Sequence, residues 1–546
     1  MNLIRVLFFI LFTAYSIFGQ DIKTTEIKIF EEFTPSIIDA TKINDRATYN
    51  DSSSNERVQQ YDFFEFNLRS NFKTKILAPA KIKDPLLDKL HNNSASFGLG
   101  NYYKTQADII YCSNRSKNKS YGIYFNHYAD KYLPAKNSKN SFHGFYKQIT
   151  LSNVYRINLI YDKRTAFYEN ENDLFDEYFR NRFAFTKLSL NIFSNKSMSN
   201  QISHNTKLSI SDLNEFSENH FHVSSNITNL FKNLPLKINT RFDSYLNYNS
   251  ELSPFISTYI NYFNFSPNYA LDKYNIILGF DLAVKSSGQN FHLMPNIKFS
   301  KELVKNIIKI ETGFSQSHYK NSMRYISEIN PYIHTYGMNQ SIYANYAFEQ
   351  NLSFTKRDKF YFSFRNILSD NDLIKTSISY SIVDNFLHFV RVDNLSYQRY
   401  KSEYIDLSEF NLECEYRKKI NNLLSLNFKC DFYNWTEDVF NTSNFKFNLQ
   451  VPFKLQQKIN ITPSVSFFSK KRFATISANQ IAVPYENQNI QKLGPYLYTN
   501  LFFEYNYSKW LSAFLNIQNL TNNKNETWLG YKEQGISMLF GIKSSF

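Results

Sequence analysis

The sequence predicts an all-β fold: a transmembrane antiparallel β-barrel of about 22 strands that follows a short N-terminal segment. Apolar and polar residues alternate along segments of eleven residues or more, and tight turns alternate with long polar loops between these segments. The last such segment ends on an aromatic residue, Phe546. We expect a signal peptide at 1–19, a periplasmic or lumen-filling segment at 20–93 and the transmembrane barrel at 94–546.

The first nineteen residues have the order of a secretory signal peptide. A short, positively charged start, Met1–Arg5, precedes a mostly apolar run, Val6–Phe18, and a small residue, Gly19. The apolar run is too short to span a bilayer as a helix, which needs about 20 residues. We expect cleavage after Gly19, and an N-terminal anchor helix is the alternative.

The composition is very aromatic, with 53 Phe and 40 Tyr, yet the mean hydropathy is −0.45. No segment after the signal peptide is apolar enough for a membrane helix, so apolar and polar residues are interspersed. A soluble all-β protein and a transmembrane barrel share this pattern. The net charge of +14 comes from basic residues that are spread evenly along the chain, which predicts no nucleic-acid partner.

The length of the alternating segments favours the barrel. In the segment 445–455 every second residue is Phe, Leu or Val, and the residues between them are Lys, Asn, Gln or Pro. The segment 234–248 has the same two faces, because side chains two residues apart in a strand point the same way. Runs of this length suit tilted membrane strands of about 9–11 residues better than sandwich strands of about five or six.

The connections between the last segments support the same fold. Tight turns are expected at 418–423, 455–459 and 507–510. Short turns on the periplasmic side and long loops outside are typical of outer-membrane barrels. We therefore expect an even number of strands, a first strand near Ser94 and both termini in the periplasm. The long external loops are expected at 433–443, 470–494 and 519–535.

The closing segment ends the chain on its apolar face, which carries Phe540, Ile542 and Phe546. A terminal aromatic residue on an alternating strand resembles the signal by which outer-membrane proteins are recognised for insertion. The resemblance implies the barrel-assembly machinery and outer-membrane lipids as partners. Pairing this segment with the first strand removes the sheet edges that lipid would leave unsatisfied.

The stretch before it resembles the closing hairpin of TonB-dependent receptor barrels, over about thirty residues. The resemblance rests on 515–524 and on the residues that follow, and the matching positions are Asn519, Leu520, Thr521, Asn522, Gly530, Tyr531, Gln534 and Gly535. It implies a receptor that imports large or scarce ligands, such as siderophores, cobalamin or glycans. It also implies a TonB-type partner in the inner membrane that supplies energy.

The N-terminal segment departs from that family, whose members carry a larger, glycine-rich plug in the lumen. Residues 20–93 contain no glycine and cannot form such a plug, although Thr25–Phe30 loosely resembles an energy-coupling box. The segment carries acidic residues, and the expected inner wall of the barrel carries basic ones. These opposite charges attract more strongly in a confined lumen than on a surface. We expect it to lie partly in the lumen. The charges are Asp21, Glu26, Glu31, Glu32, Asp39 and Asp45 against Lys237, Arg241, Lys446 and Lys454.

The sequence predicts no enzyme, no cofactor and no metal site. It lacks a Gly-x-Ser-x-Gly elbow, a His-Glu-x-x-His motif and a Gly-rich phosphate loop. His220 and His222 share a strand face with Ser224 and have metal-ligand chemistry, but polar filling of a lumen-facing strand is the preferred interpretation.

Cys414 and Cys430 form the remaining constellation. The alternation places both on the lipid face, and a hairpin that is symmetric about Asn422 makes them direct cross-strand neighbours. Free cysteine in such a place acts as a small apolar side chain. On the opposite face the same pairing brings Glu413 and Glu415 near Lys429 and Asp431.

Two functions follow from the predicted fold. The first is receptor-like transport of a solute across the outer membrane. The alternative is a structural scaffold in an outer-membrane complex, with a lipoprotein as partner. Because wide barrels are plugged, something must fill the lumen: the segment 20–93, an infolded loop or a partner. The region 369–403 is expected either as two barrel strands or as such a loop hairpin.

Overall fold

The computed structural model describes Asp62 and residues 92–546, except 114–115, 117, 133–134, 168–179, 196–201, 215–217, 232–233, 250–255, 272–275, 287–290, 334–351, 370–371, 394–397, 457 and 478–488. The chain divides into two units, Met1–Leu86 and Leu87–Phe546, and the second is described below. The signal peptide expected at 1–19 and almost all of the segment expected at 20–93 lie outside the described residues, so both stay predictions.

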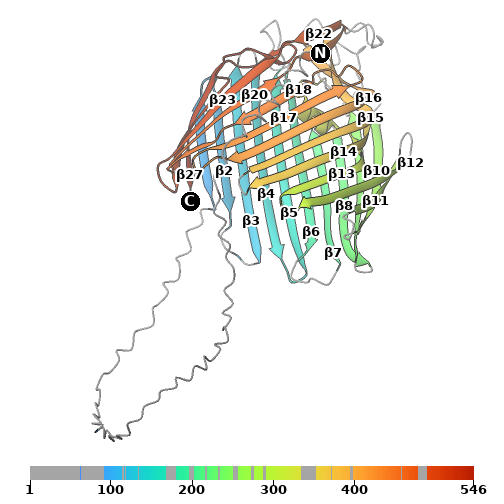
Figure 1. Cartoon of the computed structure of the whole chain (residues 1–546). Helices are drawn as coiled ribbons and strands as arrows, with labels where there is room; N and C mark the ends of the chain where they lie inside the picture. The colour runs from blue at the N-terminus through green and yellow to red at the C-terminus, as the bar shows by residue number, and fades with distance from the viewer. Residues whose placement is uncertain are drawn as a thin grey trace, which may run out of the picture. The chain divides into compact units, whose positions relative to one another are not determined.

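One sheet of the second unit closes into the predicted antiparallel barrel (Figure 1). It has 22 strands in the described residues when β18 and β19 count as one interrupted strand. The first half comprises β1 (Ser94–Gly100), β2 (Thr105–Cys112), β3 (Lys119–Tyr132), β4 (Ala135–Ile149), β5 (Asn153–Phe167), β6 (Arg180–Ser194), β7 (Ser203–Asn214), β8 (Glu218–Phe231), β9 (Leu234–Asn249), β10 (Ile256–Leu271) and β11 (Ile276–Lys285). The second half comprises β12 (Phe291–Val304), β13 (Ile308–Lys320), β14 (Phe354–Ser369), β15 (Asp372–Asp393), β16 (Gln398–Lys419), β17 (Ser425–Trp435), β18 (Phe445–Gln450), β19 (Phe453–Leu455), β20 (Ile459–Phe468), β23 (Tyr496–Asn506), β24 (Leu511–Gln518) and β27 (Ser537–Ser545).

The seam between the first and last strands closes the barrel. β1 pairs with β27 in an antiparallel register that runs from Ser94↔Ser545 to Gly100↔Leu539. One residue beyond the seam strands, the backbones of Asn93 and Phe546 exchange two hydrogen bonds of 3.1 and 2.9 Å. The closure satisfies the backbone groups that a sheet edge would leave open.

The outer face of the barrel is apolar. Large apolar side chains are exposed on strands all around the wall. Examples are Phe97, Ile123, Leu159, Ile210, Phe263, Leu293, Phe360, Ile378, Phe540 and Ile542. A soluble protein does not expose so continuous an apolar surface, whereas a lipid-facing barrel does. Among the described residues, no helix is long and apolar enough to cross a membrane.

The expected turns and loops are present near the C-terminal end. Short turns join β16 to β17, β19 to β20 and β23 to β24. Two of the three longer connections carry strands of their own: the hairpin of β21 (Lys471–Ser477) and β22 (Asn489–Leu493), and the small hairpin of β25 (Glu526–Trp528) and β26 (Tyr531–Lys532). The connection from β17 to β18 is irregular.

Two strands differ from their expected form. The segment 445–455 is interrupted at Pro452, whose nitrogen cannot donate to the sheet, so β18 and β19 are separate strands. The region 369–403 combines the two expected forms, barrel strand and loop hairpin. β15 pairs with β14 in the barrel as far as Asp384, and beyond a bulge near Asn385 (φ 56°) it continues with β16 as a hairpin above the wall.

Candidate functional site in the barrel lumen

The connection that follows β13 begins with a short helix, α2 (Met323–Ile329). The Ser322 side chain accepts from the Tyr325 backbone N–H and begins the helix. A carboxylate of the barrel wall, Glu218 at the start of β8, accepts from the backbone N–H groups of Met323 at 2.8 Å and Arg324 at 3.2 Å. Glu218 is buried, and these helix N–H groups are among the donors that stabilise its charge.

The segment around α2 crosses to a distant part of the wall. Arg324 forms an ion pair with Asp162 on β5 at 3.2 Å, and Arg164 donates to the Ser327 carbonyl at 2.6 Å. The Asn181 amide on β6 donates to the carbonyls of Pro331 and Ile333, each at 2.8 Å. Because β7 to β12 separate β6 from β13 along the wall, a connection with these contacts lies across the barrel.

Buried apolar side chains join α2 to three other connections, and we call them the mouth cluster. Its members are Phe183, Leu213, Met323, Ile326, Ile333, Phe389, Tyr400, Phe473, Leu529 and Tyr531. They come from the loop-bearing ends of β6 and β7, from α2, from the β15–β16 and β21–β22 hairpins and from the loop before β27. Since β6 and β16 lie on opposite sides of the ring, the cluster spans the mouth.

Polar contacts hold the same loops together. The Tyr400 hydroxyl donates to the Leu529 carbonyl at 2.9 Å, and the Tyr332 and Tyr531 rings stack 3.6 Å apart. Lys471 donates to the Thr527 carbonyl at 3.1 Å, and Arg472 pairs with Asp438. The described parts of these loops are therefore bonded to one another at the mouth.

The closing-hairpin residues expected from the sequence shape one of these loops. Asn519 is buried at φ 54°, and its amide donates to the carbonyls of Asn523 and Gln534 at 2.8 and 2.7 Å. Asn522 Oδ1 accepts from the Ile536 N–H, and it lies where a Cβ on Gly535 would come within 2.4 Å. Gly530 has a φ of 87°, Tyr531 belongs to the mouth cluster, and Leu520 and Thr521 are exposed.

The expected insertion-signal residues lie on the outer face. Phe540, Ile542 and Phe546 are all more than half exposed, with relative accessibilities of 59%, 54% and 59%. They contact neither α2 nor the mouth cluster. Their role in insertion stays a prediction.

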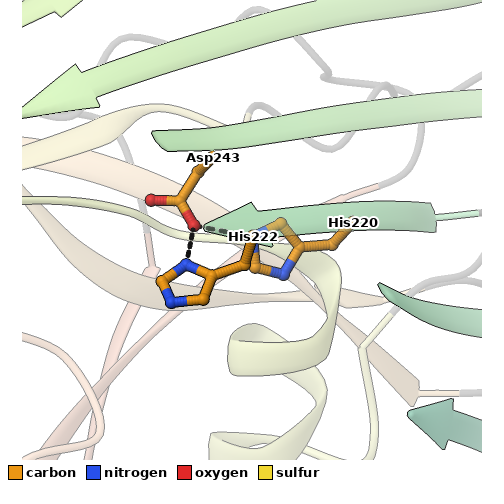
Figure 2. A group of neighbouring side chains, drawn as sticks. All are labelled: His220, His222 and Asp243. Atoms are coloured by element: carbon orange, nitrogen blue, oxygen red, sulfur yellow. Dashed lines mark hydrogen bonds and ion pairs between the residues drawn. The ribbon is translucent and has the colours of Figure 1, made fainter. Parts of the chain in front are cut away.

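The inner wall beside α2 carries a polar cluster that the sequence interpretation left incomplete (Figure 2). His220 Nε2 and His222 Nδ1 on β8 both lie against Asp243 Oδ1 on β9, at 2.8 and 2.7 Å. Asp243 is fully buried, and its other oxygen pairs with Arg241. The sequence interpretation had named the two histidines but had not paired them with Asp243. The register of β8 with β9 pairs Phe231 with Leu234 beside the turn, and the same register pairs His222 with Asp243. Counting residues outward from this turn, as for the two cysteines, therefore predicts the pairing of His222 with Asp243.

A chain of contacts connects this cluster to α2. The His220 ring stacks on Tyr245 with centroids 4.2 Å apart. Lys320 Nζ lies 4.3 Å above the Tyr245 ring and donates to Asn247 at 3.0 Å. Asn247 donates in turn to Glu218, the carboxylate at the start of α2, at 3.1 Å.

The cross-strand pairing expected for Cys414 and Cys430 is confirmed. Cys414 and Cys430 are direct cross-strand partners and both are free thiols. Lys429 forms its ion pair with Glu413 at 3.1 Å, diagonally across the hairpin. Glu415 pairs with Arg417 on its own strand.

Solved structures of outer-membrane receptors are similar to this chain over most of its length. The ferric enterobactin receptor of Pseudomonas aeruginosa matches with a TM-score of 0.60 at 11% identity, over 83% of this chain and 80% of that one. The ferric-catecholate import receptor Fiu of Escherichia coli K12 matches with a TM-score of 0.58 at 10% identity, over 83% and 82%. The chain has the fold of an outer-membrane receptor barrel.

The chain is also similar to the copper transporter OprC, with a TM-score of 0.57 at 9% identity over 83% of this chain and 80% of that one. No protein-family model and no curated protein matches the sequence. The likeness to TonB-dependent receptors that the closing hairpin indicates therefore extends, as a likeness of fold, over 83% of this chain.

Proposed function

We propose that this receptor barrel lies in the outer membrane and transports a solute through a passage that its own loops close at rest. The mouth cluster carries the proposal, because it joins loops from opposite sides of the ring into one buried layer. A barrel of this size has a lumen too wide to leave open. A passage closed by loops suits regulated, ligand-specific import better than passive diffusion.

The contacts of α2 support a closure that can be released. The wall holds this segment through single hydrogen bonds and ion pairs, such as Arg324–Asp162 and Arg164–Ser327, rather than through continuous strand pairing. A ligand that competes for these groups shifts the loop between two states by its differential affinity for them. We propose a TonB-type energy partner for the transport step, with an outer-membrane lipoprotein as the alternative partner.

The test compares two faces of the same helix. Met323→Ala with Ile326→Ala removes two buried members of the mouth cluster, at about 2–5 kcal/mol for each side chain. Tyr325→Ala with Ile329→Ala removes two side chains that are 40% and 42% exposed, and serves as the matched control. In planar bilayers we expect the natural chain and the control to conduct little and the cluster variant to open in large steps.

A solute-uptake measurement with the same proteins distinguishes the two candidate functions. Transport predicts that the cluster variant, reconstituted in liposomes, admits small solutes that the control excludes. If both variants stay as tight as the natural chain, the lumen is closed independently of α2. That outcome contradicts the proposal and favours the scaffold, whose partner would then be sought among proteins that co-purify from native membrane.

A further inference from the structure

We propose that His220, His222 and Asp243 bind a divalent transition-metal ion on the inner wall of the barrel. The three ligand atoms lie within 4.8 Å of one another. Two imidazole nitrogens and one carboxylate oxygen are a donor set that suits Zn²⁺, Cu²⁺ or Ni²⁺, whereas Mg²⁺ and Ca²⁺ prefer oxygen ligands throughout. The inference does not depend on the transport function, because the ion could be bound by an open or a closed barrel.

The two distances from Asp243 Oδ1 to the imidazole nitrogens are close to those that an ion requires. A tetrahedral Zn²⁺ with bonds of about 2.0–2.1 Å holds its ligand atoms about 3.3–3.5 Å apart. Asp243 Oδ1 now lies 2.8 Å from His220 Nε2 and 2.7 Å from His222 Nδ1, which are hydrogen-bond distances. An ion that replaces these hydrogen bonds needs the carboxylate oxygen to withdraw by roughly half an ångström from each ring.

Each ligand is oriented by a neighbour of its own. His222 Nε2 lies 3.0 Å from Ser224 Oγ, so a ring that binds an ion through Nδ1 can donate its remaining N–H to that hydroxyl. Arg241 holds the other oxygen of Asp243 and leaves Oδ1 toward the histidines. The His220 ring is fixed by its stacking on Tyr245, with an angle of 2° between the planes. Supporting contacts of this kind orient the ligands of metal sites.

The site has one open side. The Asp243 side chain is fully buried, while the His220 and His222 side chains keep 20% and 16% of their surface exposed. Figure 2 shows the two rings and the carboxylate converging, with a helix nearby in the translucent ribbon. Three protein ligands with an open position leave room for water or for a donor atom of a bound solute.

The experiment titrates the full-length protein, purified in detergent with a tag that contains no histidine and stripped by a chelator. With Zn²⁺ alone, calorimetry is expected to show one bound ion per chain. His222→Gln and Asp243→Asn are expected to lose that ion, whereas His143→Gln, a change in a histidine of β4 outside the triad, retains it. Heat-modifiable migration of each variant verifies that the barrel is folded.

Ser224→Ala provides a variant that leaves all three ligands in place. Loss of the supporting hydroxyl is expected to weaken the affinity for Zn²⁺ by about 10-fold or more, which adventitious binding elsewhere would not show. Co²⁺ substitution adds a spectrum, in which a tetrahedral nitrogen and oxygen site has intense visible bands without a sulfur charge-transfer band. Unchanged Zn²⁺ binding in His222→Gln, or a sulfur band from the cysteines, overturns the proposal, as does a natural chain that binds no Zn²⁺.

Discussion

Tyr400 is fully buried and contacts two other loops. Its hydroxyl donates to Leu529, its ring packs edge-on against Trp528 at 4.8 Å, and its backbone N–H donates to the Tyr332 carbonyl. Its side chain is also a member of the mouth cluster, whose residues come from separate segments, and so it couples the positions of those segments. Its truncation is therefore expected to loosen the whole layer of loops.

We expect Tyr400→Phe to destabilise the loop layer by about 1–3 kcal/mol, because it leaves the buried Leu529 carbonyl without its donor. Tyr400→Ala is expected to cost about 3–5 kcal/mol, because it also leaves a cavity. Limited proteolysis of the external loops measures both, and Tyr103→Ala, which removes an 80% exposed ring, is the control. Equal cleavage rates in all three variants would contradict a coupled layer.

Phe546 permits a test of assembly at a single residue. We expect deletion of Phe546 to impair insertion, because it removes both the terminal aromatic ring and the two backbone hydrogen bonds with Asn93. Phe546→Asp keeps the backbone and places a charge on the lipid face, at a cost of about 2–4 kcal/mol near the midplane and less at the interface. The amount of heat-modifiable protein in the outer membrane is the measurement. Natural amounts from both variants would show that recognition does not use this residue.

At the scale of single residues, the sequence predicts pairings between the two strands of one hairpin, because these follow from counting residues outward from the turn. Cys414 and Cys430 are paired as expected, because the tight turn between their strands fixes the register. The same count applies to His222 and Asp243, which were not paired in the sequence interpretation. Contacts such as Glu218 with the backbone of Met323 depend on a loop that crosses the barrel, and no local count reaches them.

The strands were predictable as elements because alternation is a local property of the chain. Each strand needs an apolar outer face and a polar inner face, so the pattern repeats wherever the chain crosses the membrane. The exceptions have local causes of their own. Pro452 interrupts one strand, and Asn385 adopts a left-handed backbone conformation where β15 bends into its hairpin.

The loop at 519–535 provides the test of orientation. We expect an epitope tag placed after Lys524 to be labelled by antibody on intact cells, because this loop lies at the mouth end and both termini are expected in the periplasm. Lys524 is exposed, whereas the neighbouring Asn523 donates to the Leu497 carbonyl and is better left unchanged. Labelling of broken cells alone would reverse the assigned orientation.

At the scale of the whole molecule, the mouth cluster could not be read from the sequence. Its ten members lie between positions 183 and 531, in α2, in loops and in strands, and the local sequence around each gives no partner. A barrel of this predicted width must have its lumen filled, and an infolded loop is one of the expected ways. The described part of the connection between β13 and β14, residues 321–333, contacts β5 and β6 across the barrel, as an infolded loop would.

The last prediction concerns the N-terminal segment and its expected place in the lumen. We expect removal of 21–90 to leave a folded barrel and to raise conductance in planar bilayers, if that segment fills the lumen. Because the loops also close the mouth, the truncation is best combined with Met323→Ala and Ile326→Ala, which open it. If the truncated and full-length forms of this double variant conduct equally, the segment does not occupy the lumen.

The pairing of β1 with β27 has a consequence for the rate of folding. The seam brings together residues as distant in sequence as Ser94 and Ser545, so its contacts have a very high sequence separation. Contacts of this kind slow folding, because the entropy of closing a long loop is lost before any of them forms. The edge of β1 stays unpaired until β27 has taken its place in the wall. In refolding into detergent, the central strands are thus expected to form first. The pairing of β1 with β27 is expected to follow as a separate, slow phase.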